Sequence, residues 1–173
     1  RRAIAVSAAV AAALTAGPAA APGATPSTLR ASLSSTGAEL GLGTYSSVQA
    51  RASVSTDGRW VTFESSDPNV VPGDTNGTFD VFQRDLRTGV VRRVSQTATG
   101  VQANGNAWQH AASADGAVVA FQTSATTIGA GTTNSADDVY VWRRGDGSLR
   151  RVSTNLTGND PNSWSRDPRP SPD

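Results

Sequence analysis

Few side chains in this sequence have the types and spacing that chemistry requires. The chain contains no cysteine and one histidine, His110, so a Ser–His–Asp triad would have to use that residue. No G-x-S-x-G sequence occurs to present a serine nucleophile at a strand-to-helix turn. We therefore predict no catalytic residue and no cofactor, and we interpret His110 as a histidine in a loop or at the edge of a sheet.

A second candidate is the segment 74–80, which places oxygen-bearing side chains at alternating positions. Such a spacing suits Ca²⁺, which prefers oxygen ligands. The segment departs from the EF-hand pattern, because glycine stands in its fourth place and no glutamate follows at the twelfth. A turn is therefore the preferred interpretation, and the residues that remain as weak metal-ligand candidates are Asp74, Asn76 and Asp80.

All 15 basic residues are arginines, and several form pairs, at 92–93, 143–144 and 150–151. If these pairs lie on outer strands or turns, one member of each strand pair faces water and discourages pairing with other sheets. An anionic partner is the alternative interpretation. The formal net charge is only +1, and it falls to −1 without Arg1 and Arg2, so a nucleic-acid partner is not expected.

These candidates lie within a repeat of 58 residues. Residues 55–58, S-T-D-G, recur at 113–116 as S-A-D-G, and Asp173 continues the same interval. Comparing residues 51–97 with residues 109–155 gives 47 ungapped pairs, of which 16 are identical. The residues that define the repeat are Ser55, Asp57, Gly58, Val61 and Phe63, with Ser113, Asp115, Gly116, Val119 and Phe121 in the second copy.

Each repeat predicts four short antiparallel strands, which in the first copy span 52–55, 59–64, 80–86 and 90–97. An Asp-Gly pair suits the tight turn between the first two strands. In the second strand, apolar residues alternate with others, which places one face in a core. A long polar loop joins the second and third strands. The Asp57 and Asp115 carboxyls are explained by the turn rather than by an acidic site.

Four-stranded antiparallel units at a fixed period predict an all-β fold of β-propeller blades. A β-sandwich is the structural alternative, but its strands do not repeat their sequence every fourth strand. The S-x-D-G-x-x-V-x-F motif at 55–63, with D-V-F at 80–82, resembles the WD40-like (PD40) repeats of TolB-type propellers. The resemblance implies a role in binding, and it weakens in the second loop, where Thr132 replaces Asp74.

The expected organisation places a secretory signal peptide at 1–24, cleaved between 19 and 24, because two arginines precede an apolar, alanine-rich stretch. No membrane span is expected after cleavage. A linker at 25–49 contains an orphan outer strand at about 29–36, since residues 30–37 match 93–100 and 151–158. This strand is predicted to pair with the last three strands of the full chain and so to close the ring. The blades follow at 50–107 and 108–165, with the start of a third at 166–173 in an incomplete ring that the remaining blades of the same chain would complete.

The leading functional prediction is a secreted, non-catalytic scaffold that binds a protein or glycan partner, since a fold alone supplies no chemistry. The alternative is the propeller module of a larger secreted enzyme, such as a prolyl-oligopeptidase-like serine peptidase. Three aromatic residues, Tyr45, Trp108 and Trp164, are expected in loops that enter blades. They are predicted to pack between blades, with a binding face as the alternative.

Overall fold

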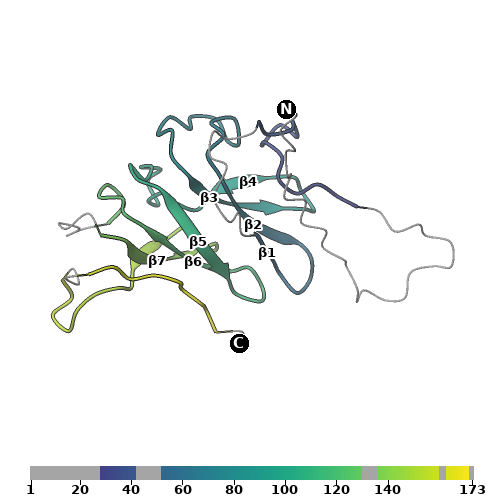
Figure 1. Cartoon of the computed structure of the whole chain (residues 1–173). Helices are drawn as coiled ribbons and strands as arrows, with labels where there is room; N and C mark the ends of the chain where they lie inside the picture. The colour runs from purple at the N-terminus through teal and green to yellow at the C-terminus, as the bar shows by residue number, and fades with distance from the viewer. Residues whose placement is uncertain (1–27, 42–51, 130–135, 160–162, 172–173) are drawn as a thin grey trace, which may run out of the picture.

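The computed structural model describes residues 28–41, 52–129, 136–159 and 163–171. They form two antiparallel sheets, each built from four strands in chain order (Figure 1). The described part contains no helix, so the predicted all-β class with four-stranded units is confirmed. Sheet 1 contains β1 (Ala52–Val54), β2 (Trp60–Ser65), β3 (Asp80–Asp85) and β4 (Val91–Arg93), and sheet 2 contains β5 (Ala107–Ala112), β6 (Val118–Thr123), β7 (Asp138–Arg143) and β8 (Leu149–Arg151).

The two sheets share one register, displaced by the repeat length. Phe63 lies opposite Phe82 in sheet 1, and Phe121 lies opposite Tyr140 in sheet 2. The ring centroids are 5.7 Å apart in the first pair and 6.0 Å apart in the second. Aromatic cross-strand pairs of this kind stabilise a sheet and fix its register. The sheets are therefore two copies of one unit, as expected of successive propeller blades.

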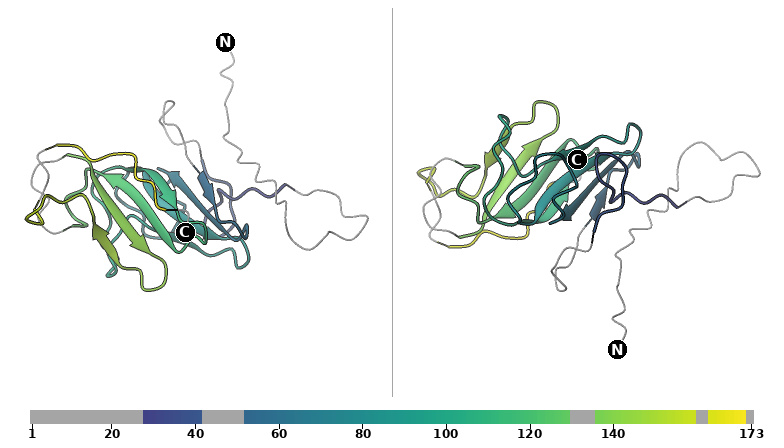
Figure 2. Two further views of the ribbon diagram at one scale, coloured as in Figure 1. Left: turned by 90° about the horizontal axis from the view of Figure 1, so that it is seen from below. Right: turned by 90° about the horizontal axis from the view of Figure 1, so that it is seen from above.

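The main core joins the two sheets. Val81 of β3 and Val94, which follows β4, belong to the same buried cluster as Phe121 and Tyr140 of sheet 2. A second cluster on sheet 1 contains Phe63 and Phe82. Because Phe63 and Phe82 correspond to Phe121 and Tyr140, each sheet uses the same face for its aromatic pair. Figure 2 shows the sheets side by side, with residues 163–171 running along sheet 2.

The S-x-D-G turn has the same hydrogen bonds in both sheets. The Ser55 hydroxyl donates to Asp57 Oδ1 at 2.5 Å and accepts from the Trp60 amide at 2.9 Å. Ser113 makes the equivalent bonds to Asp115 and Val118, at 2.6 and 3.0 Å. Each aspartate also accepts from the amide two residues later. The repeat-defining serine and aspartate residues therefore hold the first hairpin of each sheet closed.

The fourth strands are shorter than the eight residues expected from the sequence. In sheet 1, Val94 donates its amide to Val81 O at 2.7 Å, but the Val81 amide donates to the Ser95 hydroxyl rather than to a backbone oxygen. Val139 and Ser153 repeat this bond in sheet 2, at 2.9 Å. The backbone ladder ends where the serine side chain replaces it, so β4 and β8 have three residues each.

The turn that follows the fourth strand occurs three times. Glycines with positive φ close it at Gly37, Gly100 and Gly158, with φ values of 83°, 86° and 81°. Each glycine amide donates to the carbonyl three residues earlier, at 2.9 Å. The first copy belongs to the segment expected to contain an outer strand at 29–36. There the structure has a single bridge, Leu33 to Glu39, which matches the bridge from Gln96 to Gln102.

Residues 28–41 lie against sheet 1 instead of forming a strand. The Arg84 guanidinium donates to the carbonyls of Leu33 and Ser34, at 3.1 and 3.2 Å. The Ser35 amide donates to Val70 O at 2.7 Å, and Ala31 packs against the Phe63 cluster. No described strand lies beside this segment to form a ladder with it. Its pairing with further strands stays a prediction.

Several expectations concern residues outside the described ranges. The signal peptide at 1–24, Tyr45, Thr132 and the repeat start at Asp173 are among them. Within the described ranges, no helix has the length and apolar character needed to cross a membrane.

We expect Gly116→Ala to destabilise the chain more than Gly147→Ala. Both glycines have positive φ, 66° and 68°, so both alanine variants carry the same backbone strain, of about 1 kcal/mol. A Cβ atom at Gly116 would lie 2.8 Å from Trp60 Cβ, whereas one at Gly147 meets nothing within 4 Å. Urea unfolding of both variants measures the difference, and equal losses would contradict the Trp60 contact.

Candidate functional site

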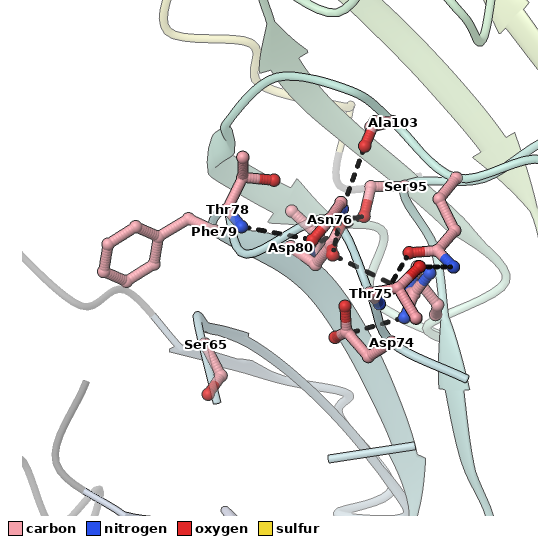
Figure 3. A network of polar contacts seen from close by, with 12 residues as sticks. Ser65, Asp74, Thr75, Asn76, Thr78, Phe79, Asp80, Ser95 and Ala103 are labelled. Carbon is pink, nitrogen blue, oxygen red and sulfur yellow. Dashed lines mark hydrogen bonds and ion pairs between the residues drawn. The ribbon is translucent and has the colours of Figure 1, made fainter. Parts of the chain in front are cut away.

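The weak metal-ligand candidates lie together, around an arginine. We call Asp74, Asn76, Asp80, Arg93 and Ser95 the Asp80 cluster, and Figure 3 labels its members Asp74, Asn76, Asp80 and Ser95. Asp74 Oδ2 lies 3.1 Å from Arg93 Nη2, and Asp80 Oδ2 lies 3.6 Å from Arg93 Nε. Asn76 donates to Asp80 Oδ2 at 2.8 Å, and the Ser95 hydroxyl donates to Asp80 Oδ1. These contacts join the loop 72–78 to β3 and to the end of β4.

The guanidinium of Arg93 supplies the positive charge that a metal ion would otherwise bring. The side chains of Asp74, Asp80 and Arg93 are 4%, 0% and 3% exposed, so their charges are buried together. Arg93 Nε and Nη2 lie at ion-pair distance from the carboxylates but without hydrogen-bond geometry. Within the described ranges, no three His, Cys, Asp or Glu side chains are grouped to hold a metal ion.

The contacts among Asp80, Arg93 and Ser95 recur in sheet 2. Arg151 Nη1 lies 3.4 Å from Asp138 Oδ2, and the Ser153 hydroxyl donates to Asp138 Oδ1 at 2.8 Å. Asp138, Arg151 and Ser153 follow Asp80, Arg93 and Ser95 by one repeat. The aspartate at the start of the third strand is therefore a structural residue of each sheet, tied to the fourth strand by an arginine and a serine.

Burial controls the protonation of the carboxyls in the Asp80 cluster. It raises the pKa of Asp80 to about 6, although the hydrogen bonds from Ser95 and Asn76 and the charge of Arg93 act in the opposite direction. Burial also raises the pKa of Asp74, against the charge of Arg93. Desolvation disfavours the charged form of a carboxyl, and here it outweighs the compensating contacts.

We expect the stability contribution of Asp80 to fall as pH rises from about 4 to about 6. Its folded pKa lies above its unfolded value, so the folded chain binds the proton more tightly and loses that advantage when Asp80 ionises. The loss is about 3 kcal/mol, since the pKa is raised from 3.8 to about 6 and one pKa unit corresponds to about 1.4 kcal/mol. Urea unfolding of the native chain and of Asp80→Asn from pH 4 to 7.5 measures it.

Asp85 provides a control of opposite sign for this experiment. The hydrogen bond from Arg59 lowers the pKa of Asp85, with Arg59 Nη2 at 2.9 Å from Asp85 Oδ2. Its stabilising contribution is therefore present above its unfolded pKa and lost as pH falls. The difference between the native chain and Asp85→Asn should therefore stay constant from pH 7.5 to about 4 and decrease only at lower pH. A fall with rising pH for both aspartates would contradict the Asp80 assignment.

His110 lies within β5, the edge strand of sheet 2, where its side chain is buried between the two sheets. Its Nδ1 is 2.9 Å from Glu64 Oε1, and its Nε2 is 3.1 Å from Thr62 O. The side chains of His110 and Glu64 are 0% and 1% exposed. The predicted position at the edge of a sheet is confirmed, since β5 is the first strand of sheet 2, whereas the loop alternative is not. The burial of the side chain against sheet 1 was not predicted.

A β-bulge accounts for the position of His110. The register of β5 shifts between Trp108 and Ala111, and Gln109 has φ of 50°. Asp167, one repeat later, has φ of 52°. The His110 amide donates to Glu64 Oε1, and the Asp167 amide donates to Gln122 Oε1, at 3.2 and 3.3 Å. The positive φ and an amide hydrogen bond to a side chain of the preceding sheet therefore recur one repeat later, although residues 163–171 form no strand. The sequence pattern did not reveal this recurrence.

The arginine and tryptophan candidates separate into exposed and buried members. Arg92 is exposed and Arg93 is buried, as strand alternation predicts for one member of the pair. Trp108 lies in β5 rather than in a loop. Trp164 is 64% exposed, with the Arg166 guanidinium 4.0 Å from its ring centroid. Trp164 and Arg166 therefore form a stacked pair on the surface beside sheet 2.

A groove of about 350 Å³ lies where the outer strand of sheet 1 meets sheet 2. Residues from the loop after β2, from β4 and the turn behind it, and from the β7–β8 hairpin form its walls. The sequence offered no signal for this groove, because its walls come from segments up to 76 residues apart. Its lining includes Val71, Pro72, Val91, Arg92, Trp142 and Gly147.

Comparisons with known proteins yield structural likenesses but no match in sequence. No protein-family model matches the chain, and no curated protein matches its sequence. Among solved structures, the chain is similar to TolB from Acinetobacter baumannii, with 21% sequence identity and a TM-score of 0.38. The match covers 66% of this chain and 23% of that protein, so the chain spans less than a quarter of its length. The PD40 resemblance of the repeat motif stays a prediction.

Proposed function

We propose that this chain belongs to a non-catalytic, extracytoplasmic β-propeller that serves as a scaffold for a protein or glycan partner. The observation that carries the proposal is that the same contacts between polar and charged side chains occur in the first and in the second sheet. The carboxyl, guanidinium and hydroxyl contacts of Asp80, Arg93 and Ser95 are repeated by Asp138, Arg151 and Ser153. A contact made in successive units serves the unit, whereas a reaction needs a particular arrangement of groups at one place.

His110 supports the same proposal from a different direction. Its ring is sealed between the sheets, with both nitrogens within 3.1 Å of acceptors in sheet 1. A general base must reach the proton that it removes from a substrate, directly or through one water molecule. A fully buried histidine with both nitrogens engaged holds the two sheets together instead. The surface groove is then the natural place for a partner.

Cross-linking of the full chain in its native compartment, followed by mass spectrometry, would identify the partner of the scaffold. The purified partner should bind saturably, and His110→Asn should leave that affinity within about twofold provided that the variant folds, as judged by circular dichroism. Turnover of a peptide or glycoside substrate that disappears in His110→Asn and in Glu64→Gln would contradict a non-catalytic role.

The extracytoplasmic part of the proposal depends on residues 1–24 and needs its own test. These residues, fused to a reporter enzyme that is active only after export, should direct the reporter out of the cytoplasm. A fusion in which the apolar run is interrupted by two arginines is the matched control. If neither fusion is exported, the extracytoplasmic location is contradicted. The proposed scaffold function is unaffected by that result.

A further inference from the structure

Strand β4 is the outer edge of sheet 1, and part of its backbone has no partner. Arg92 pairs with Gln83, and the bonds from Asp85 N to Val90 O and from Val94 N to Val81 O flank that pair. In an antiparallel ladder, alternate residues point their N–H and C=O groups to opposite sides. The backbone groups of Val91 and Arg93 therefore point away from β3, and no described residue hydrogen-bonds to them.

These backbone groups border the groove described above. Val91 and Arg93 are lining residues, together with the apolar side chains of Val71, Pro72 and Trp142. Val90, next to the groove, is 49% exposed. An unpaired strand edge beside an apolar wall is the arrangement that accepts an extended peptide as an additional strand. Main-chain hydrogen bonds supply affinity in that mode, and pockets for alternate side chains supply specificity.

The charge of the groove selects the kind of peptide. Its lining includes two arginines and no acidic residue. Arg93 is neutralised by Asp74 and Asp80, whereas Arg92 is exposed and has no carboxylate partner in the described part of the chain. A carboxylate of the incoming strand would pair with Arg92, because an arginine guanidinium donates two parallel hydrogen bonds to a carboxylate.

We propose that β4 and this groove bind an extended segment of a partner protein that alternates aliphatic and acidic residues. The segment adds a fifth strand to sheet 1 through the backbone of Val91 and Arg93. Its aliphatic side chains lie on Pro72 and Trp142, and an acidic side chain meets Arg92. This inference rests on the proposed scaffold function and names the chemistry of its protein partner.

The test uses an acetylated, amidated hexapeptide of alternating glutamate and valine as the probe, with the ¹⁵N-labelled full chain. We expect saturable binding, with the largest amide shifts at Val91 and Arg93. Two peptides serve as controls: one has lysine in place of glutamate, and the other is N-methylated at alternate amides, which blocks strand addition. Equal binding of either control peptide, or no binding of the acidic peptide, would overturn the proposal.

A pair of charge reversals tests the role of Arg92. Arg92→Glu should weaken binding of the acidic peptide at least about tenfold, because a like charge then faces the glutamate. Arg150→Glu is the matched control, since Arg150 is the exposed residue of β8 one repeat later and does not line the groove. Equal losses in both variants would indicate long-range attraction and contradict the groove.

The outcome separates this inference from the scaffold function. If the cross-linked partner binds Arg92→Glu as tightly as the native chain, the groove assignment fails and the scaffold stands. If the chain turns over a substrate through His110, the scaffold itself fails.

Discussion

Arg93→Ala is expected to lower the free energy of unfolding by about 3–5 kcal/mol, because it leaves buried carboxylates without their counter-charge. Arg93 lies between Asp74 and Asp80, and all three side chains are less than 5% exposed. Removing one partner of a buried ion pair costs more than the pair itself contributes. Urea unfolding of the full chain at pH 7.5 measures the loss.

Arg92→Ala is the matched control for this variant. Arg92 precedes Arg93 in the same strand but is exposed, and exposed surface substitutions usually change stability by less than about 0.5 kcal/mol. The loss in Arg93→Ala should also be smaller at pH 5, where Asp80 can hold a proton, since its pKa is raised to about 6. Similar losses in both arginine variants would contradict the buried cluster.

A double variant separates the charge effect from lost packing. Adding Asp80→Asn to Arg93→Ala removes one of the buried carboxylates that Arg93→Ala leaves without a counter-charge. The double variant should therefore lose less stability than the sum of the losses in the two single variants. Residues of one hydrogen-bond network are commonly non-additive by about 0.5–3 kcal/mol. Strict additivity would mean that Asp80 and Arg93 do not interact in the folded chain.

Phe121→Ala is the second substitution with a large expected effect, again about 3–5 kcal/mol. The Phe121 side chain is fully buried and stacks on Tyr140, with 6.0 Å between ring centroids. It belongs to the cluster that includes Val81 and Val94 of sheet 1, so the cavity would lie between the sheets. We therefore expect hydrogen exchange to speed up in both sheets.

Leu156→Ala is the control, because Leu156 is fully exposed and should tolerate truncation within about 0.5 kcal/mol. Faster exchange confined to sheet 2 in Phe121→Ala would show that the sheets unfold independently. A loss below about 1 kcal/mol would contradict the position of Phe121 in a shared core.

Much of the fold could be predicted from local patterns. Turn residues act within four or five positions, so the S-x-D-G motif predicted the hairpins that Ser55 and Asp57 close. Alternation within a strand predicted the common face of Val61 and Phe63, and both belong to one buried cluster. The ends of β4 and β8 were not predicted, because they depend on a serine side chain bonding across to the third strand.

The candidate site was harder to predict. Asp74, Asn76 and Asp80 were recognised as a group of oxygen-bearing side chains, but the arginine that pairs with the two aspartates, Arg93, lies on β4. The pairing of Asp80 with Arg93 is repeated by Asp138 with Arg151, and both pairs lie within the aligned repeats. The repeat therefore indicated that these aspartates and arginines belong to each unit. Only the contact between strands shows which arginine of each Arg-Arg pair points into the core.

By itself, the sequence determined the 58-residue unit, its four strands, its turns and the faces of its apolar residues, because each depends on neighbours a few positions apart. Only the tertiary structure decided which polar groups are used up in buried contacts and which surface remains for a partner. The bulge at Gln109, the burial of His110 against Glu64 and the groove beside β4 all arise where one sheet meets the next. Distances between sheets depend on how whole faces pack, and no local spacing of residues encodes them.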